Sequence, residues 1–108
     1  MEEFKDITPE EAEKLIKEGK LDRIIDIREL WENEYVRLEN TELIPMGEIN
    51  GRLEEFQNGE HKLIYCHHGN RSWHVCSYLA SLGIKNLYNL VGGIDRWHYD
   101  VDDSIKTY

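Results

Sequence analysis

The 108-residue chain has the length of one domain, and we place no domain boundary within residues 1–108. Thirteen basic against twenty-two acidic side chains give a formal net charge of −9, which argues against binding to nucleic acid or to an anionic membrane. The first residues show no signal-peptide pattern, no stretch approaches a membrane span, and two cysteines are too few for a disulfide framework, so we expect a reducing cytoplasm.

The N-terminal half predicts two helices around a strand. Residues 8–11 (Thr-Pro-Glu-Glu) are typical of a helix start with an N-cap threonine and a capping box, and Gly19 ends that helix. The short apolar run over 23–27 indicates a buried strand. Residues 29–35 then predict a short second helix.

The second half repeats this alternation. We expect, in chain order, an extended piece over 43–46, a helix with Ile49, Leu53 and Phe56 on its inner face, a strand over 62–65, a helix that ends near Gly83, a strand over 86–91 and a helix that begins at 94. Strands that alternate with helices predict an α/β sandwich around a mainly parallel sheet.

The segment from Cys66 to Arg71 (Cys-His-His-Gly-Asn-Arg) joins the most apolar strand to a helix. In open parallel sheets ligands bind at this carboxyl end. A loop that curls over a helix N-terminus aims backbone N–H groups inward, and together with the helix dipole they favour a thiolate over a thiol. Each residue alone is ordinary, because a single cysteine at a strand end is often a small core residue. Their order favours an anion cradle with a nucleophilic sulfur at its centre.

Four segments resemble the rhodanese family of sulfurtransferases, over nearly the whole chain. Asp26-Ile27-Arg28-Glu29 resembles the family's Asp-x-Arg strand end, and Ile44-Pro45 resembles its Ile-Pro segment. Residues 65–72 resemble its active-site loop, and residues 90–97 resemble its Gly-Gly…Trp signature. The resemblance implies a rhodanese-like three-layer α/β sandwich. Family members usually carry Gly-His-Ile-x-Gly-Ala before the Ile-Pro. Residues 36–43 depart from that pattern, so we expect a differently shaped loop there.

The resemblance also implies a double displacement. The Cys66 thiolate takes the outer sulfur of a donor such as thiosulfate, and cyanide or a cellular thiol removes it from the persulfide. Arg71 would stabilise the charged donor or leaving group, and no metal or organic cofactor is implied. The implied partners are a small anionic sulfur donor, a thiol acceptor and a sulfur-relay protein. The substrate-binding residues would be His67, His68, Gly69, Asn70 and Ser72.

Two other functions compete with this one. Cysteine phosphatases have five residues between the cysteine and the arginine, because phosphate needs a wider cradle than one sulfur, whereas four separate Cys66 from Arg71. The spacing therefore disfavours a phosphatase. A non-catalytic or sulfur-carrier module would also use Cys66, so the sequence separates it only weakly from an enzyme.

Several other residues have a structural interpretation beside the functional one. For Asp26 and Arg28 we favour an ion pair that caps the sheet over a role in orienting the loop. For Cys76 we favour a buried core residue over a thiol that resolves Cys66. Trp97, Tyr99 and Tyr88 are expected to pack the last helix onto the core.

Metal binding is disfavoured. The candidate ligands are Cys66, His67, His68, His74 and Cys76. Three consecutive ligands fit poorly around one tetrahedral ion, and the chain has no Cys-x2-Cys or His-x3-His pair.

Overall fold

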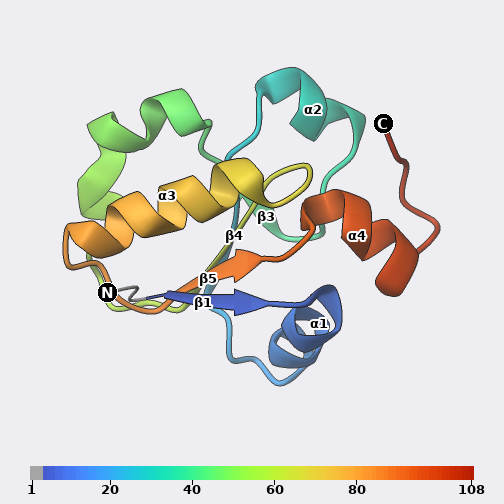
Figure 1. Cartoon of the computed structure of the whole chain (residues 1–108), viewed down its shortest axis with the longest axis horizontal. Helices are drawn as coiled ribbons and strands as arrows, with labels where there is room; N and C mark the ends of the chain where they lie inside the picture. The colour runs from blue at the N-terminus through green and yellow to red at the C-terminus, as the bar shows by residue number, and fades with distance from the viewer. Residues whose placement is uncertain (1–3) are drawn as a thin grey trace.

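The structure, a computed structural model, describes residues 4–108. Residues 1–3 lie outside the described residues, and with them the start of the segment that was examined for a signal peptide. Five parallel strands form one sheet in the order β1-β5-β4-β2-β3. Figure 1 shows β1 and β5 side by side at one edge of this sheet. The strands are β1 (Phe4–Ile7), β2 (Arg23–Asp26), β3 (Thr41–Leu43), β4 (Lys62–Tyr65) and β5 (Leu87–Leu90). The helices are α1 (Pro9–Lys17), α2 (Leu30–Tyr35), the 3-10 helix η1 (Met46–Phe56), α3 (Asn70–Ser81) and α4 (Gly93–Asp100).

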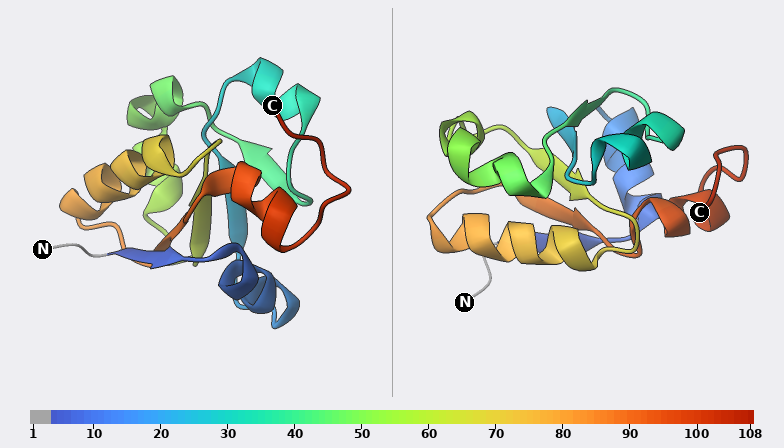
Figure 2. Two further views of the ribbon diagram at one scale, coloured as in Figure 1. Left: turned by 45° about the vertical axis from the view of Figure 1, so that its right-hand side comes forward. Right: turned by 90° about the horizontal axis from the view of Figure 1, so that it is seen from above.

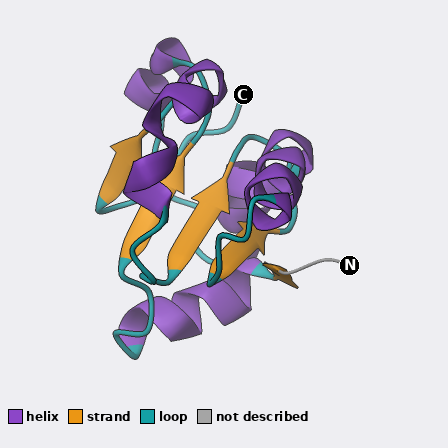
Figure 3. Cartoon of the chain, turned by 90° about the vertical axis from the view of Figure 1, so that its left-hand side faces the viewer, coloured by secondary structure: helices purple, strands orange, loops and turns teal. Residues whose placement is uncertain are grey.

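Helices cover both faces of the sheet, so the expected α/β sandwich is confirmed (Figure 3). On one face, η1 and α3 enclose a core that includes Ile25, Ile64 and Phe56. On the other, α1 and α4 enclose a core that includes Leu63, Leu90 and Trp97. β4 is the central strand and is buried along its whole length, as a continuous apolar run in a parallel sheet predicts.

Local signals place the first helix correctly. The Thr8 hydroxyl accepts a hydrogen bond from the Glu11 amide at 3.2 Å, and the Glu11 carboxylate accepts one from the Thr8 amide at 2.8 Å. This reciprocal pair is the predicted capping box. It ends β1 and turns the chain into α1 with the helix's apolar side toward the sheet.

Three features differ from the sequence prediction. β1 was not expected, because an edge strand with two exposed charged residues at its centre, Lys5 and Asp6, lacks an apolar run. The inner face of η1 is as predicted, but the segment is a 3-10 helix interrupted at Arg52 rather than an α-helix. Tyr99 is 71% exposed and does not pack on the core, because Trp97 and Ile94 occupy the inner face of α4.

The parallel strands bring the polar residues that follow them to one end of the sheet. β2 ends at Asp26, and β4 is followed directly by Cys66. The two further views in Figure 2 show α2 and residues 101–108 meeting near this end. No helix within residues 4–108 is long and apolar enough to cross a membrane.

Candidate active site

Two glycine-dependent contacts shape the loop after β4. Gly69 lies in the left-handed region at φ 98°, where it begins α3, and a Cβ there would lie 2.9 Å from the amide nitrogen of Gly92. The start of α4 also holds the loop, because the amides of Ile94 and Asp95 donate to the carbonyls of Cys66 and His67, both at 3.0 Å. The Gly92-Gly93 turn therefore fixes the backbone next to the sulfur.

The Cys66 sulfur lies inside a ring of donors at the N-terminus of α3. The amides of Gly69 and Ser72 donate to Sγ at 3.2 and 3.3 Å, and the Ser72 hydroxyl lies 3.3 Å away. Cys66 is 1% exposed. Two N–H donors and the positive end of a twelve-residue helix stabilise negative charge on this sulfur, which is what a nucleophilic thiolate requires.

A chain of hydrogen bonds orients the buried Ser72. Its hydroxyl donates to Asn89 Oδ1 at 2.6 Å, and Asn89 Nδ2 donates to Asp6 Oδ1 at 2.9 Å. Because Asp6 fixes which face of the Asn89 amide points at Ser72, the hydroxyl proton is directed to Asn89. The hydroxyl then has no proton left for the sulfur, so the two amides are the donors that stabilise a thiolate on Cys66. Asn89 and Asp6 were not anticipated from the sequence.

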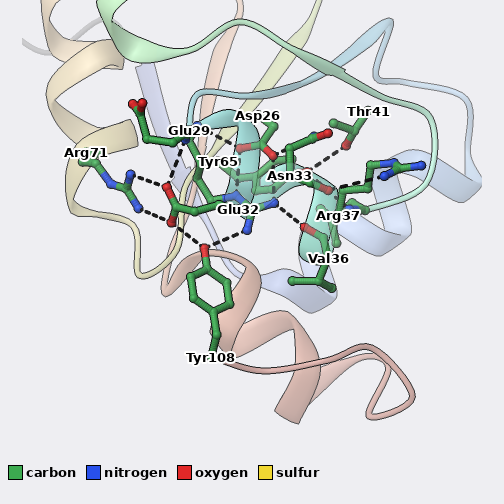
Figure 4. Close-up of polar contacts among 12 residues, drawn as sticks. Asp26, Glu29, Glu32, Asn33, Val36, Arg37, Thr41, Tyr65, Arg71 and Tyr108 are labelled. Atoms are coloured by element: carbon green, nitrogen blue, oxygen red, sulfur yellow. Dashed lines mark hydrogen bonds and ion pairs between the residues drawn. The ribbon is translucent and has the colours of Figure 1, made fainter.

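Arg71 is held by a carboxylate rather than by the cradle. Its Nη1 and Nη2 donate to the two oxygens of Glu32 at 2.9 and 3.0 Å, which raises the pKa of Arg71 (Figure 4). Glu32 is buried, which opposes its ionisation, yet hydrogen bonds from Arg71 and Tyr108 hold its pKa at about 2. Arg71 and Glu32 therefore form a charge-neutral pair beside the loop.

Asp26 and Arg28 form a buried ion pair at the end of β2. Arg28 donates to the two oxygens of Asp26 at 2.9 and 2.7 Å and to the carbonyl of Val36 at 2.6 Å. Both side chains are fully buried. The pair closes the end of the sheet and anchors the chain that leads into the divergent segment 36–43, whose last residues form β3.

The rings of His67 and His68 lie against each other at an interplanar angle of 34°. Their ring centroids lie 3.8 Å apart, and His67 Nε2 is buried with no hydrogen-bond partner within residues 4–108. Burial, and then the neighbouring His68, lower the pKa of His67, which disfavours the cationic form of this ring. His68 is exposed and lies 3.9 Å from Asp95. The two rings together line one side of the Cys66–Arg71 loop.

Within residues 4–108, one group offers ligand atoms close enough to suggest a metal ion, namely His67, His68 and Asp95, all within 4.8 Å of one another. His74 and Cys76 do not join this group, because Cys76 lies in the core and His74 lines a hollow between η1 and α3.

The structure thus brings together only part of the expected site. Among residues 4–108, hydrogen bonds reach Sγ from Gly69 and Ser72 and not from His67, His68, Asn70 or Arg71. The Asn70 side chain is exposed at the first position of α3. Sequence analysis did not identify Glu32. The signal that could have found it is the need of the Arg71 cation for a nearby negative charge, which Glu32 supplies from α2, the helix that follows the Asp-x-Arg segment.

Comparison with known proteins places this geometry in a family. The family model described as rhodanese-like domain matches residues 8–100. The chain belongs to the rhodanese-like domain family. The sequence resemblance and the three-layer fold that it implied are both confirmed by this match.

Two individual relatives of this rhodanese-like domain match it over nearly their whole length, and a third matches over part of its length. The thiosulfate sulfurtransferase GlpE of Coxiella burnetii is 31% identical over 106 residues, which cover 96% of this chain and 98% of that protein. A crystal structure of a rhodanese-like domain protein from Staphylococcus aureus is 33% identical, with a TM-score of 0.81 over 96% of this chain and 98% of that one. A putative sulfur carrier protein of Bacillus subtilis, YrkF, is 32% identical over 68% of this chain and 40% of its own length. The relatives support a role in rhodanese-type sulfur transfer.

Proposed function

We propose that this protein is a sulfurtransferase that carries a sulfane sulfur on Cys66, with thiosulfate or a similar small anion as the donor. The Cys66 thiolate attacks the outer sulfur of thiosulfate, a new S–S bond forms, and the electron pair of the old S–S bond leaves with sulfite. The terminal sulfur of the persulfide is then taken by cyanide, which gives thiocyanate, or by a thiol, and the thiolate is regenerated. Both steps are nucleophilic displacements and need no external oxidant or reductant.

The observation that carries this proposal is the pair of amides, from Gly69 and Ser72, that donate to Sγ from the start of α3. Preorganised N–H groups stabilise charge on the thiolate before the reaction and on the persulfide after it. The cradle spans six residues from Cys66 to Arg71, which fits one added sulfur atom better than a phosphate group.

Arg71 retains the capacity to bind an anion. Its two hydrogen bonds to Glu32 use two of the five N–H groups of a guanidinium. The Arg71 side chain is 36% exposed, whereas Glu32 beneath it is 5% exposed. An incoming donor therefore meets Arg71 from solvent while Glu32 holds the guanidinium in place.

A sulfur-carrier role is the second candidate. The likeness to a protein named as a putative sulfur carrier supports it. In that case the donor is a persulfide on a partner protein rather than free thiosulfate. A reducing compartment such as the cytoplasm is the proposed setting for either role, because Cys66 must stay reduced to react.

The test is incubation of the wild type, Cys66→Ser and Cys76→Ala with thiosulfate, followed by intact-mass measurement and by thiocyanate determination with cyanide. We expect the wild type and Cys76→Ala to gain one sulfur atom and to produce thiocyanate, and Cys66→Ser to do neither. A sulfur adduct on Cys66→Ser would reject Cys66 as the carrier. Persulfide formation only from a persulfidated protein, with no turnover of free thiosulfate, would favour the carrier role.

A further inference from the structure

Residues 102–108, here named the strap, run from the end of α4 to α2 and the active-site loop (Figure 2). The ring of Tyr108 lies parallel to the imidazole of His67, with centroids 3.8 Å apart and an interplanar angle of 4°. Trp31 and Tyr35 of α2 meet the same ring edge-on, at 5.7 and 6.0 Å. The strap therefore ties α2 to the loop residue next to Cys66.

The Tyr108 hydroxyl joins two ion pairs. It accepts a hydrogen bond from Arg28 Nη1 at 2.7 Å and donates one to Glu32 Oε2 at 2.6 Å (Figure 4). The same Glu32 oxygen accepts from Arg71 Nη2 at 3.0 Å. Burial, and then the adjacent carboxylate, raise the pKa of Tyr108 to about 12, so the phenol keeps its proton at neutral pH. Glu32 thus shares its charge between Tyr108 and Arg71.

This sharing bears on the sulfur. Arg71 is close enough to Cys66 for a charge on the sulfur to raise the pKa of the guanidinium. A carboxylate that already accepts a phenol hydrogen bond compensates less of its neighbour's positive charge than one without it. Without the Tyr108 hydroxyl, the negative charge of Glu32 would be neutralised by Arg71 alone. The positive electrostatic potential that Arg71 produces at Cys66 would therefore be smaller.

We propose that Tyr108 is a positioning residue for the reaction at Cys66: through Glu32 it sets the place and effective charge of Arg71, and through His67 it holds the loop. For the use of an anionic sulfur donor, the inference rests on the proposed function. The proposal also predicts how strongly Cys66 prefers anionic over neutral alkylating reagents, and this preference can be measured without any sulfur transfer.

The experiment compares the alkylation of Cys66 by iodoacetate, an anion, with its alkylation by iodoacetamide, a neutral reagent of similar size. The ratio of the two rate constants, followed by mass spectrometry on the Cys66 peptide, reports the potential at the sulfur. We expect Tyr108→Phe to lower this ratio by about two- to tenfold, the range given by the loss of one hydrogen bond. The matched control is Tyr35→Phe, which removes a hydroxyl 3.5 Å from the carbonyl of Thr107 in the same strap without touching Glu32, and which should keep the wild-type ratio.

A double-mutant cycle distinguishes action through Glu32 from general loosening of the strap. In a Glu32→Gln background, Tyr108→Phe should change the ratio little, because the charge that Tyr108 shares is gone. Equal effects in the two backgrounds would overturn the proposal, as would a wild-type ratio in Tyr108→Phe at a temperature where circular dichroism shows it folded. Tyr108→Leu, which loses the ring as well, must lower the ratio at least as far. A wild type that forms no persulfide from thiosulfate would reject the proposed donor and leave this cycle intact.

Discussion

Substitution of Gly93 by alanine tests how the start of α4 supports the sulfur. Gly93 has a φ of 62°, in the left-handed region, and a Cβ there would lie 2.3 Å from the carbonyl oxygen of His67 and 2.5 Å from that of Cys66. Real Cβ atoms do not approach backbone atoms closer than 3.0 Å, so the loop must move away by about 0.7 Å. The movement acts on the two carbonyls that accept hydrogen bonds from Ile94 and Asp95.

The expected cost has two parts. A left-handed alanine costs about 1–2 kcal/mol relative to glycine. Weakening two backbone hydrogen bonds adds about 1 kcal/mol for each. We therefore expect Gly93→Ala to lower the free energy of unfolding by about 3–4 kcal/mol. Because the displaced backbone carries Cys66, we also expect persulfide formation to slow by about tenfold or more, the scale on which misplacement of a reacting group by about 1 Å is felt.

The matched control is Gly83→Ala, which has a similar left-handed φ of 86° but nothing within 4 Å of the added Cβ. Urea unfolding gives the two stabilities, and intact mass after brief exposure to thiosulfate gives the two rates of persulfide formation. Gly83→Ala should lose only the conformational part and react at the wild-type rate. If both variants lose the same stability within about 0.5 kcal/mol, or if Gly93→Ala reacts as fast as the wild type, the loop does not depend on this contact.

Two further predictions concern charge. The pKa of Glu32 in the folded protein, about 2, lies below its ordinary 4.5, so the ionised carboxylate stabilises the fold above pH 4.5, and this stability is lost as the pH falls toward 2. Urea unfolding should show the wild type losing up to about 3 kcal/mol more than Glu32→Gln over that interval, and parallel pH profiles would contradict the assignment. The net charge of −9 repels an anionic donor at long range, so the KM for thiosulfate should fall as salt is added, and a KM that rises with salt would contradict this reasoning.

The elements that sequence analysis predicted well are those determined by neighbours along the chain. The capping box at Thr8, the apolar run of β4 and the strand-to-helix turn at Cys66 each carry their information within a few residues. The predicted contacts of Sγ with the loop amides follow from the same local geometry. β1 escaped prediction because its stabilising partner, β5, lies more than 80 residues away in the sequence.

The parts of the site that sequence analysis missed depend on distant partners. The expected role of Arg71 toward an anionic donor stays a prediction, but its partner Glu32, 39 positions earlier, was not anticipated. Asn89 reaches Ser72 across 17 positions, and Tyr108 reaches Glu32 across 76. None of these pairs leaves a periodic pattern or a turn signal, because hydrogen bonding between distant side chains is set by the packing of the sheet and helices.

The hydrogen bonds from Ile94 and Asp95 to the loop carbonyls have a consequence for the order of folding. The loop that carries Cys66 cannot take its final shape until residues some 28 positions further along are in place. During synthesis from the N-terminus, Cys66 therefore leaves the ribosome well before the backbone that arranges it. A chain interrupted ahead of Gly92 would lack the two amides that hold these carbonyls, so the segment that carries Cys66 would be left unarranged.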